Sequence, residues 1–195
     1  MQRFDLSFPL TNELFERMEK LAAKHTHIQK IDLFGHIGTH LDLMGKPFPE
    51  DYFTLSGRVF DVQKIAGRDI ETTDINLDCI AENDFVFLHS GCLSSLSYGS
   101  DEYMADPIQL SWDLIDNLIS KKVAMIGIDF AGIRQQKEHH KADTICAEAG
   151  TFVVENVYSL ENLPIESEYS TFTVNCYPTR LADATGLPCR VIAEI

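Results

Sequence analysis

Apolar and polar positions along the chain predict helices in three segments. Apolar residues spaced three and four apart follow Thr11 and Asn12, either of which suits the N-cap of a helix. The same spacing marks residues 111–121, with Ser111 as the expected N-cap. A third helix is expected over residues 139–149, because Gly150 is a typical stop signal after it. The apolar positions of the first helix are Leu14, Phe15, Met18, Leu21 and Ala22.

Other segments alternate apolar and polar residues or are short and apolar throughout, which predicts strands. Helices and strands interleave, so the fold class is α/β. Several strands follow one another without a helix between them, which favours a mixed central sheet. No repeat or linker interrupts the 195 residues, so one domain over residues 1–195 is expected. The expected strands are residues 4–7, 28–33, 58–65, 84–88, 123–129, 152–155, 169–176 and 190–195.

The charge balance and the cysteines narrow the choice of partners and compartment. The chain has 30 acidic and 16 basic residues, for a net charge of −14. Such a surface repels phosphate backbones, so no nucleic-acid partner is expected. No apolar run is long enough for a membrane-spanning helix, and residues 1–9 do not look like a signal peptide. Five scattered cysteines without Cys-x-x-Cys spacing indicate reduced thiols, and therefore a cytoplasmic protein.

Residues 36–42, His-Ile-Gly-Thr-His-Leu-Asp, are the strongest candidate for chemistry. Imidazole and carboxylate ligands together suit zinc, manganese or iron(II). On a straight strand His36 and His40 would lie about 13 Å apart, too far to share an ion, and the glycines and β-branched residues around them disfavour a helix. A turn at Gly38 would let both imidazoles face one point, while His40 and Asp42 already share a strand face. Any one of these residues alone would most often have no metal-binding role, but the three together predict a metal site.

The same segment resembles the signature of the cyclase family, His-x-Gly-Thr-His-x-Asp-x-Pro-x-His. This family includes bacterial kynurenine formamidase and isatin hydrolase. Further segments are similar to the family in the same order, so the resemblance extends over nearly the whole chain. They are residues 4–10 (FDLSFPL), 87–91 (FLHSG), 125–129 (MIGID), 152–156 (FVVEN) and 186–193 (GLPCRVIA).

The resemblance implies a swivelling β/β/α domain with a mixed central sheet. It also implies an arylformamidase-like, metal-dependent hydrolase that cleaves a C–N bond in a small amide, formamide or cyclic amide. A metal-activated water would attack the carbonyl carbon of this small-molecule substrate. One or two divalent ions, zinc or manganese, are expected as cofactors. Because the family commonly forms dimers, a homo-oligomer is expected as well.

The resemblance also carries ligand roles onto this sequence. His36, His40 and Asp42 match the ligands of a first metal, and Glu155 matches a carboxylate on a second. The partner of Glu155 would be His139 or His140, and only one of them should coordinate, because adjacent residues on a helix point about 100° apart. We assign His140 as the metal ligand and as a catalytic candidate.

Three positions depart from the family pattern. Phe8 and Lys46 stand where the family has histidines, and Met44 stands where it has a proline. The histidine replaced by Lys46 is the expected proton shuttle, a role that suits imidazole because its pKa lies near 7. A lysine shuttles protons only if burial or a nearby cation lowers its pKa. Lys46 is therefore a catalytic candidate, a candidate for binding an acidic substrate, or a plain surface lysine.

These departures keep two alternatives to a hydrolase open. One is a catalytically altered relative that binds metal and a small acid, and the other is a metal-dependent cyclase or dehydratase. Several further residues also carry two interpretations. His89 is a candidate for substrate binding or a structural histidine, and Asp129 either orients a ligand histidine or caps a turn. Tyr98 and Tyr103 shape the pocket or the core, whereas Trp112 is expected in the core.

Overall fold

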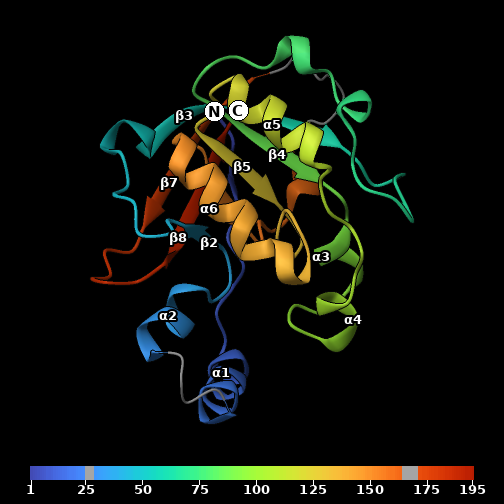
Figure 1. Ribbon diagram of the computed structural model, residues 1–195. Helices are drawn as coiled ribbons and strands as arrows, with labels where there is room; N and C mark the ends of the chain where they lie inside the picture. Colours follow the sequence, from blue (N-terminus) through green and yellow to red (C-terminus); the bar gives the residue numbers. More distant parts are fainter. Residues whose placement is uncertain (25–28, 164–170) are drawn as a thin grey trace.

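The computed structural model describes residues 1–24, 29–163 and 171–195. Within them one mixed sheet curls on itself (Figure 1). Its strands are β1 (Arg3–Asp5), β2 (His40–Asp42), β3 (Thr54–Asp61), β4 (Asp84–His89), β5 (Met125–Ile128), β6 (Phe152–Glu155), β7 (Phe172–Pro178) and β8 (Gly186–Glu194). The strand order is β1-β8-β2-β6-β5-β4-β3-β7, and an additional pairing of β7 with β8 closes seven of them into a ring. The strands from β3 to β6 pair in parallel, and the remaining pairs are antiparallel.

Four of the helices lie in two places around this ring. Helices α5 and α6 lie in front of the parallel strands, whereas α1 and α2 form a separate pair near the ends of β2 and β8 (Figure 1). The helix bounds are α1 (Asn12–Lys24), α2 (Lys30–Gly35), α3 (Cys92–Ser95), α4 (Asp101–Met104), α5 (Trp112–Ser120) and α6 (His139–Ala149). Short 3₁₀ turns occupy Glu50–Phe53, Thr72–Asp74, Leu77–Cys79, Gln136–Glu138 and Leu160–Asn162. None of the helices in the described ranges is long and apolar enough to cross a membrane.

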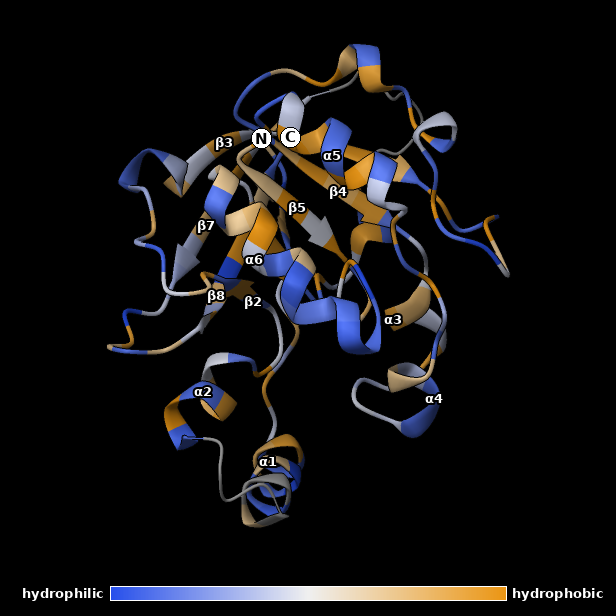
Figure 2. Cartoon of the chain, viewed as in Figure 1, coloured by the Kyte–Doolittle hydropathy of each residue, from blue (hydrophilic) through white to orange (hydrophobic). Residues whose placement is uncertain are grey.

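The hydrophobic core has two layers, one inside the ring and one between the sheet and the helices. Strand β4 serves both, because alternate side chains point to opposite faces. Phe85 and Phe87 pack inside the ring with their ring centroids 4.1 Å apart, while Val86 and Leu88 face α5. The neighbouring strand must leave room for these rings, since a Cβ on Gly127 would lie 2.5 Å from Phe87 Cδ1. Burial on both faces explains why the central strands are largely hydrophobic along their length (Figure 2).

The three predicted helices are confirmed, and their ends are close to those expected. Thr11 Oγ1 accepts a hydrogen bond from Leu14 N at 3.3 Å ahead of α1. Ser111 Oγ accepts one from Leu114 N at 3.1 Å ahead of α5, and Gly150 ends α6 with a φ of 82°. The mixed α/β sheet is also confirmed. The swivelling character of the domain stays a prediction.

The strand predicted over residues 28–33 is wrong. Residues from Lys30 to Gly35 form α2, and residue 28 lies outside the described residues. In a segment this short, the period of 2 of a strand and the period of 3.6 of a helix give similar patterns of apolar residues. Packing against the rest of the protein therefore decides between helix and strand. Here α2 rests on β8 so closely that a Cβ on Gly35 would lie 2.4 Å from Gly186 O.

Several other strands exist but are displaced from their predicted bounds, and the strand expected over residues 4–7 is β1, Arg3–Asp5. The strand expected over residues 58–65 is β3 and ends earlier, because Ile65 N donates to Val62 O and turns the chain. The strand expected over 190–195 is β8, which begins at Gly186 despite a glycine and a proline that usually mark turns. The strand expected over 169–176 is β7, and residues 169 and 170 lie outside the described ranges. The short helices α3 and α4 were not predicted.

Candidate metal centre

The segment that carries the histidine motif turns sharply between α2 and β2. His36 follows the last residue of α2, and Gly38 has a φ of 60°, a conformation that favours glycine. The chain then enters β2, which places His40 opposite Glu155 of β6. The predicted turn at Gly38 is therefore confirmed, and it brings the rings of His36 and His40 to a centroid distance of 4.9 Å.

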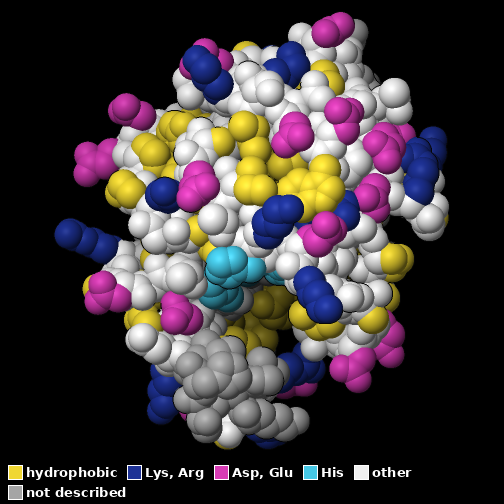
Figure 3. Space-filling model, in the orientation of Figure 1, with side chains coloured by type: hydrophobic (Ala, Val, Ile, Leu, Met, Phe, Trp, Pro, Cys, Tyr) yellow, Lys and Arg dark blue, Asp and Glu magenta, His cyan; other side chains and the backbone are white. Residues whose placement is uncertain are grey.

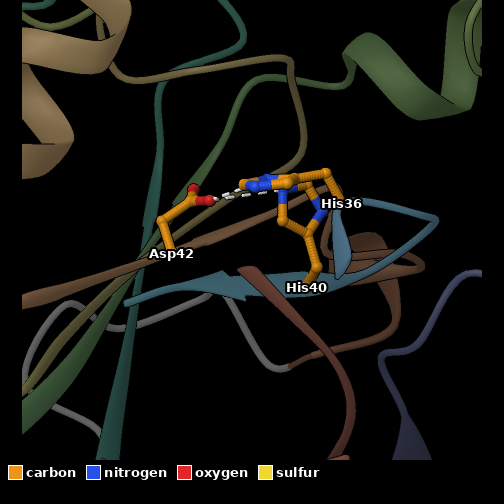
Figure 4. Close-up of side chains that lie close together, drawn as sticks. All are labelled: His36, His40 and Asp42. Atoms are coloured by element: carbon orange, nitrogen blue, oxygen red, sulfur yellow. Dashed lines mark ion pairs between the residues drawn. The ribbon is translucent and has the colours of Figure 1, made fainter. Parts of the chain in front are cut away.

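The first candidate metal group consists of His36, His40 and Asp42 (Figure 4). Asp42 Oδ1 lies 3.0 Å from His36 Nδ1 and 3.6 Å from His40 Nε2. The side chains of His40 and Asp42 are buried, each with 3% of its surface exposed. One carboxylate oxygen thus faces both imidazoles, in a geometry that would let the three residues share one cation.

The other nitrogen of each imidazole is held by a group that orients the ring. His40 Nδ1 lies 2.9 Å from the carbonyl oxygen of Gly38, so this nitrogen carries the proton. His36 Nε2 lies 3.0 Å from Thr185 Oγ1, and that hydroxyl donates in turn to Asp32 Oδ1. When a metal ion binds, these tautomers would present an unprotonated nitrogen of each ring beside Asp42, which is the form that binds a metal ion. Without metal, burial opposes protonation of His36, but the hydrogen bond from its Nδ1 to Asp42 raises the pKa of His36.

The second candidate metal group consists of His139, Asp143 and Glu155. His139 Nε2 lies 3.0 Å from Glu155 Oε1 and 3.2 Å from Asp143 Oδ2. His139 and Asp143 are one turn apart on α6, so they share a helix face that is directed at the end of β6. Glu155 Oε2 also lies 3.5 Å from His40 Nε2, which joins the two groups into one constellation.

Three buried carboxylates meet in this constellation, and their charges are only partly compensated. Burial, with the charges of Asp42 and Glu155, raises the pKa of Asp143 to about 9. The hydrogen bond to Glu155 raises the pKa of His139 to about 9. Within the described residues, Asp42 Oδ2 and Asp143 Oδ1 are buried without a hydrogen-bond partner. Orphaned carboxylate oxygens beside oriented imidazoles fit the donor set of a divalent cation.

The structure brings His139, and not His140, to Glu155. His140 is exposed on the outer side of α6, where its carbonyl oxygen and Nδ1 contact Thr144 Oγ1. The candidate group therefore contains His139 in place of the expected His140, because the first residue of α6 is the one whose side chain faces β6. Asp143 was missed by the sequence reasoning. Its signal was available, since it lies four residues after His139 on a predicted helix.

Lys46 and His89, the other predicted site residues, do not reach this constellation. Lys46 is exposed on the turn that follows β2, and it does not line the cavity of about 560 Å³ beside the metal groups. His89 is 2% exposed at the end of β4 and does not line that cavity either. Asp129 accepts hydrogen bonds from Ser90 N, Ser90 Oγ and Gly91 N, so it caps the turn after β4 and does not orient a ligand histidine.

A cavity of about 560 Å³ opens above the two metal groups. Figure 3 shows histidine side chains at the edge of a hollow with hydrophobic side chains inside it. Tyr98 and Tyr103 both line this cavity, whereas Trp112 packs against the outer core layer as expected. Tyr98 Oη accepts a hydrogen bond from Gly38 N, and Tyr103 Oη donates to Asn156 Oδ1. The remaining lining residues are Leu14, Arg17, Met18, Asp32, Leu33, His36, His40, Gly99, Met104, Ala131, His139, Glu155, Asn156 and Thr185.

Residues 4–134 match the family model described as "Putative cyclase". Because this range is about two thirds of the 195 residues, the chain belongs to that family. The matched range contains His36, His40 and Asp42, and it ends before His139 and Glu155. No curated protein matches the chain.

Solved structures share the fold at low sequence identity. "The Structure Of Potential Metal-Dependent Hydrolase With Cyclase Activity" aligns with a TM-score of 0.75 at 21% identity, over 98% of this chain and 96% of that chain. A predicted metal-dependent hydrolase from Bacillus stearothermophilus aligns at 0.72 and 19% identity, over 98% and 97%. Isatin hydrolase A from Labrenzia aggregata, bound to benzyl benzoate, aligns at 0.67 and 19% identity, over 80% and 72%. At these identities the likeness establishes the fold.

Proposed function

We propose that this protein is a metal-dependent hydrolase that cleaves a C–N bond in a small amide, formamide or cyclic amide. One observation carries the proposal: two candidate metal groups, joined through Glu155 and His40, lie beneath a cavity with buried carboxylate oxygens that lack a partner in the described chain. The structural neighbours support this proposal, because two are described as metal-dependent hydrolases and one is a hydrolase of isatin, a cyclic amide.

The donor set would divide between two ions. His36, His40 and Asp42 would hold the first, and His139, Asp143 and Glu155 would hold the second. Both sets combine imidazole nitrogen with carboxylate oxygen, and we propose zinc or manganese as the metal. A bound divalent cation supplies hydroxide at neutral pH and polarises a carbonyl oxygen.

The chain's own residues would orient and confine the substrate. Apolar side chains from α1 and α2 line the cavity and keep water from the reacting bond. Burial raises the pKa of Tyr98, so its phenol keeps its proton at neutral pH. With Gly38 N holding the phenol oxygen, Tyr98 can donate a hydrogen bond to a carbonyl oxygen in the cavity. We give it this role in place of Lys46, which lies outside the cavity.

A second candidate function is a relative that binds metal and a small acid without hydrolysis. The observation that favours it is the absence of imidazole at positions 8 and 46. Phe8 packs on Tyr98 with ring centroids 4.6 Å apart, and Lys46 is exposed. Neither side chain is an imidazole, the group whose ordinary pKa lies near 7.

The deciding experiment measures metal content by elemental analysis of protein purified without chelator, followed by an amide screen. We expect about one or two equivalents of zinc or manganese in the wild type and far less in Asp42→Asn. Isatin and formanilide then serve as the first substrates, with products separated by liquid chromatography. A wild type that stays metal-free after incubation with either ion would overturn the proposal. Metal without turnover of any amide would favour the second candidate.

We also propose, from the family resemblance, that the protein is a homo-oligomer, and from the lack of Cys-x-x-Cys spacing in the sequence that it acts in the cytoplasm. Four of the cysteines, including Cys92, are buried. Light scattering coupled to size-exclusion chromatography measures the oligomeric state. A monomeric mass across the micromolar range would contradict the homo-oligomer.

A further inference from the structure

The cavity above the metal groups is acidic at its floor and largely apolar on its walls. Leu14 and Met18 of α1, Leu33 of α2 and Met104 of α4 supply much of the apolar wall. Among the lining residues of the described chain, Arg17 is the one that carries a permanent positive charge. Since Arg17 is exposed while it lines the cavity, its guanidinium lies where solvent and an incoming ligand can both reach it.

Arg17 differs from most arginines of this chain because no carboxylate of the described residues forms an ion pair with it. Its Nη1 donates instead to the carbonyl oxygen of Tyr98 at 2.9 Å. Of the other arginines, Arg180 is the one that also lacks a carboxylate partner in the described ranges, and it does not line the cavity. The paired arginines are Arg3, Arg58, Arg68, Arg134 and Arg190.

An arginine left unpaired is unexpected in a chain with 30 acidic residues. The guanidinium has five N–H donors, and the bond to Tyr98 uses one of them. That bond holds the group against the cavity wall at Gly99, where an added Cβ would lie 3.3 Å from Nη1. The nearby acid on α2, Asp32, is already engaged, because it accepts hydrogen bonds from Thr185 N and Thr185 Oγ1.

We propose that Arg17 binds a carboxylate on the substrate, so that the substrate class is a small amide with an apolar body and an anionic group remote from the scissile bond. A guanidinium pairs with a carboxylate through two parallel hydrogen bonds, which would fix the orientation of the amide over the metal groups. A chain of net charge −14 repels anions at long range, so a local cation is needed to admit one. This inference rests on the proposed hydrolase function.

Isothermal titration of the metal-loaded protein tests the proposal without requiring turnover. The probes are benzoate, phenylacetate and hippurate, each compared with its neutral amide, and the variants are Arg17→Gln and Arg17→Lys. We expect the wild type to bind at least one carboxylate more tightly than its amide. Arg17→Gln should weaken the binding of that carboxylate by about 10-fold to 100-fold, as expected for a charge-assisted bond. The affinity for the matching amide should change by less than about 2-fold. Arg17→Lys should restore part of the loss.

Arg180→Gln is the matched control, because it removes an arginine that also lacks a carboxylate partner among the described residues but lies outside the cavity. It should bind every probe as the wild type does. The proposal is wrong if no carboxylate is preferred over its amide, or if Arg17→Gln weakens both equally. It is also wrong if the preference survives in Arg17→Gln and disappears in Asp42→Asn, since the metal would then hold the anion.

These experiments distinguish failure of the proposed anion site at Arg17 from failure of the proposed hydrolase function. A protein that prefers carboxylates through Arg17 and cleaves no amide supports the anion site and contradicts the hydrolase. A protein that cleaves hippurate and its amide at equal rates, with or without Arg17, supports the hydrolase and contradicts the anion site. Metal content of Arg17→Gln should equal that of the wild type, because Arg17 contacts neither metal group.

Discussion

The two metal groups differ in the balance between imidazoles and acids. In the first group two imidazoles face one carboxylate, and each ring is oriented by a neutral partner, Gly38 O or Thr185 Oγ1. In the second group a single imidazole, that of His139, lies between two buried carboxylates. Once its protons are lost, the second group would carry more negative charge than the first, so it depends more on protons or a cation to hold its side chains together.

Because of this difference, the two groups should prefer different metal ions and respond differently to loss of metal or protons. A site with two nitrogen donors suits zinc, whereas one with more carboxylate oxygens suits the harder manganese ion. Orientation by neutral partners should keep the first group in place without metal. The side chains of the second group should be held less firmly once Asp143 and His139 lose their protons.

The largest effect is expected from Asp42→Asn, because Asp42 Oδ1 faces both imidazoles of the first group. An amide keeps the size of the side chain but removes its charge. We expect metal affinity at the first group to fall by more than about 100-fold, beyond what loss of an orienting partner produces. Elemental analysis after dialysis against a weak chelator measures it. A variant that retains all its metal would show that Asp42 is not a ligand.

A smaller and more selective loss of bound metal is expected from His139→Ala. This change removes the nitrogen donor of the second group and leaves the first group intact. Bound metal should fall by about one equivalent if two ions are present, with affinity for the remaining ion changed by less than about 10-fold. His140→Ala is the matched control one residue away, and it should retain the metal content of the wild type. Equal losses in both variants would contradict the assignment of His139.

The pH dependence of stability should separate the two groups in protein stripped of metal. The folded pKa of Asp143 is about 9 against an ordinary value of 3.8, so folding holds a proton that the unfolded chain releases. That contribution is fully present below about pH 4 and is lost as the pH rises through 9. His139 has an ordinary pKa of 6.5 and a folded pKa of about 9. It therefore adds a further loss of folding stability as the pH rises between those two values.

Thermal unfolding of chelator-treated protein at pH 6, 7.5 and 9 measures this effect. We expect the Tm of the wild type to fall by about 4 °C or more across the series. The fall should be smaller in Asp143→Asn, because an amide has no proton to lose. With metal restored the trend should reverse, since metal binding to deprotonated ligands strengthens as the pH rises. A variant that matches the wild type at every pH would show that Asp143 does not carry the effect.

The smallest effect is expected from Lys46→Ala. The side chain is exposed and does not line the cavity, so turnover and metal content should stay within about 2-fold of the wild type. Initial rates on the best amide of the screen measure this, with Tyr98→Phe as the contrasting variant inside the cavity. A loss of 100-fold in Lys46→Ala would restore this lysine as a catalytic group.

Local features of the fold and of the first group could be predicted from the sequence. A short motif fixes its own geometry when one glycine turns the chain, as Gly38 does between His36 and His40. The second group needed the fold, because its residues come from α6 and β6. Sequence alone left His139 and His140 equivalent, and packing of α6 against the sheet decided between them. The same limit explains α2, whose six residues carried no pattern strong enough to separate helix from strand.

The closure of the ring by β8 also dictates the order in which this centre can be assembled. Strand β2, His40–Asp42, lies between two later strands. Residues 186–188 of β8 pair with it on one side, and β6 pairs with it on the other. Strand β8 is joined in turn to β1 by Arg3 and Glu194, which are 191 residues apart. Such long-range pairing is slow to form, since loop closure must come before the contacts that compensate for it. During synthesis the histidine motif would emerge long before either neighbour of its strand, so the metal centre should form as one of the last events of folding.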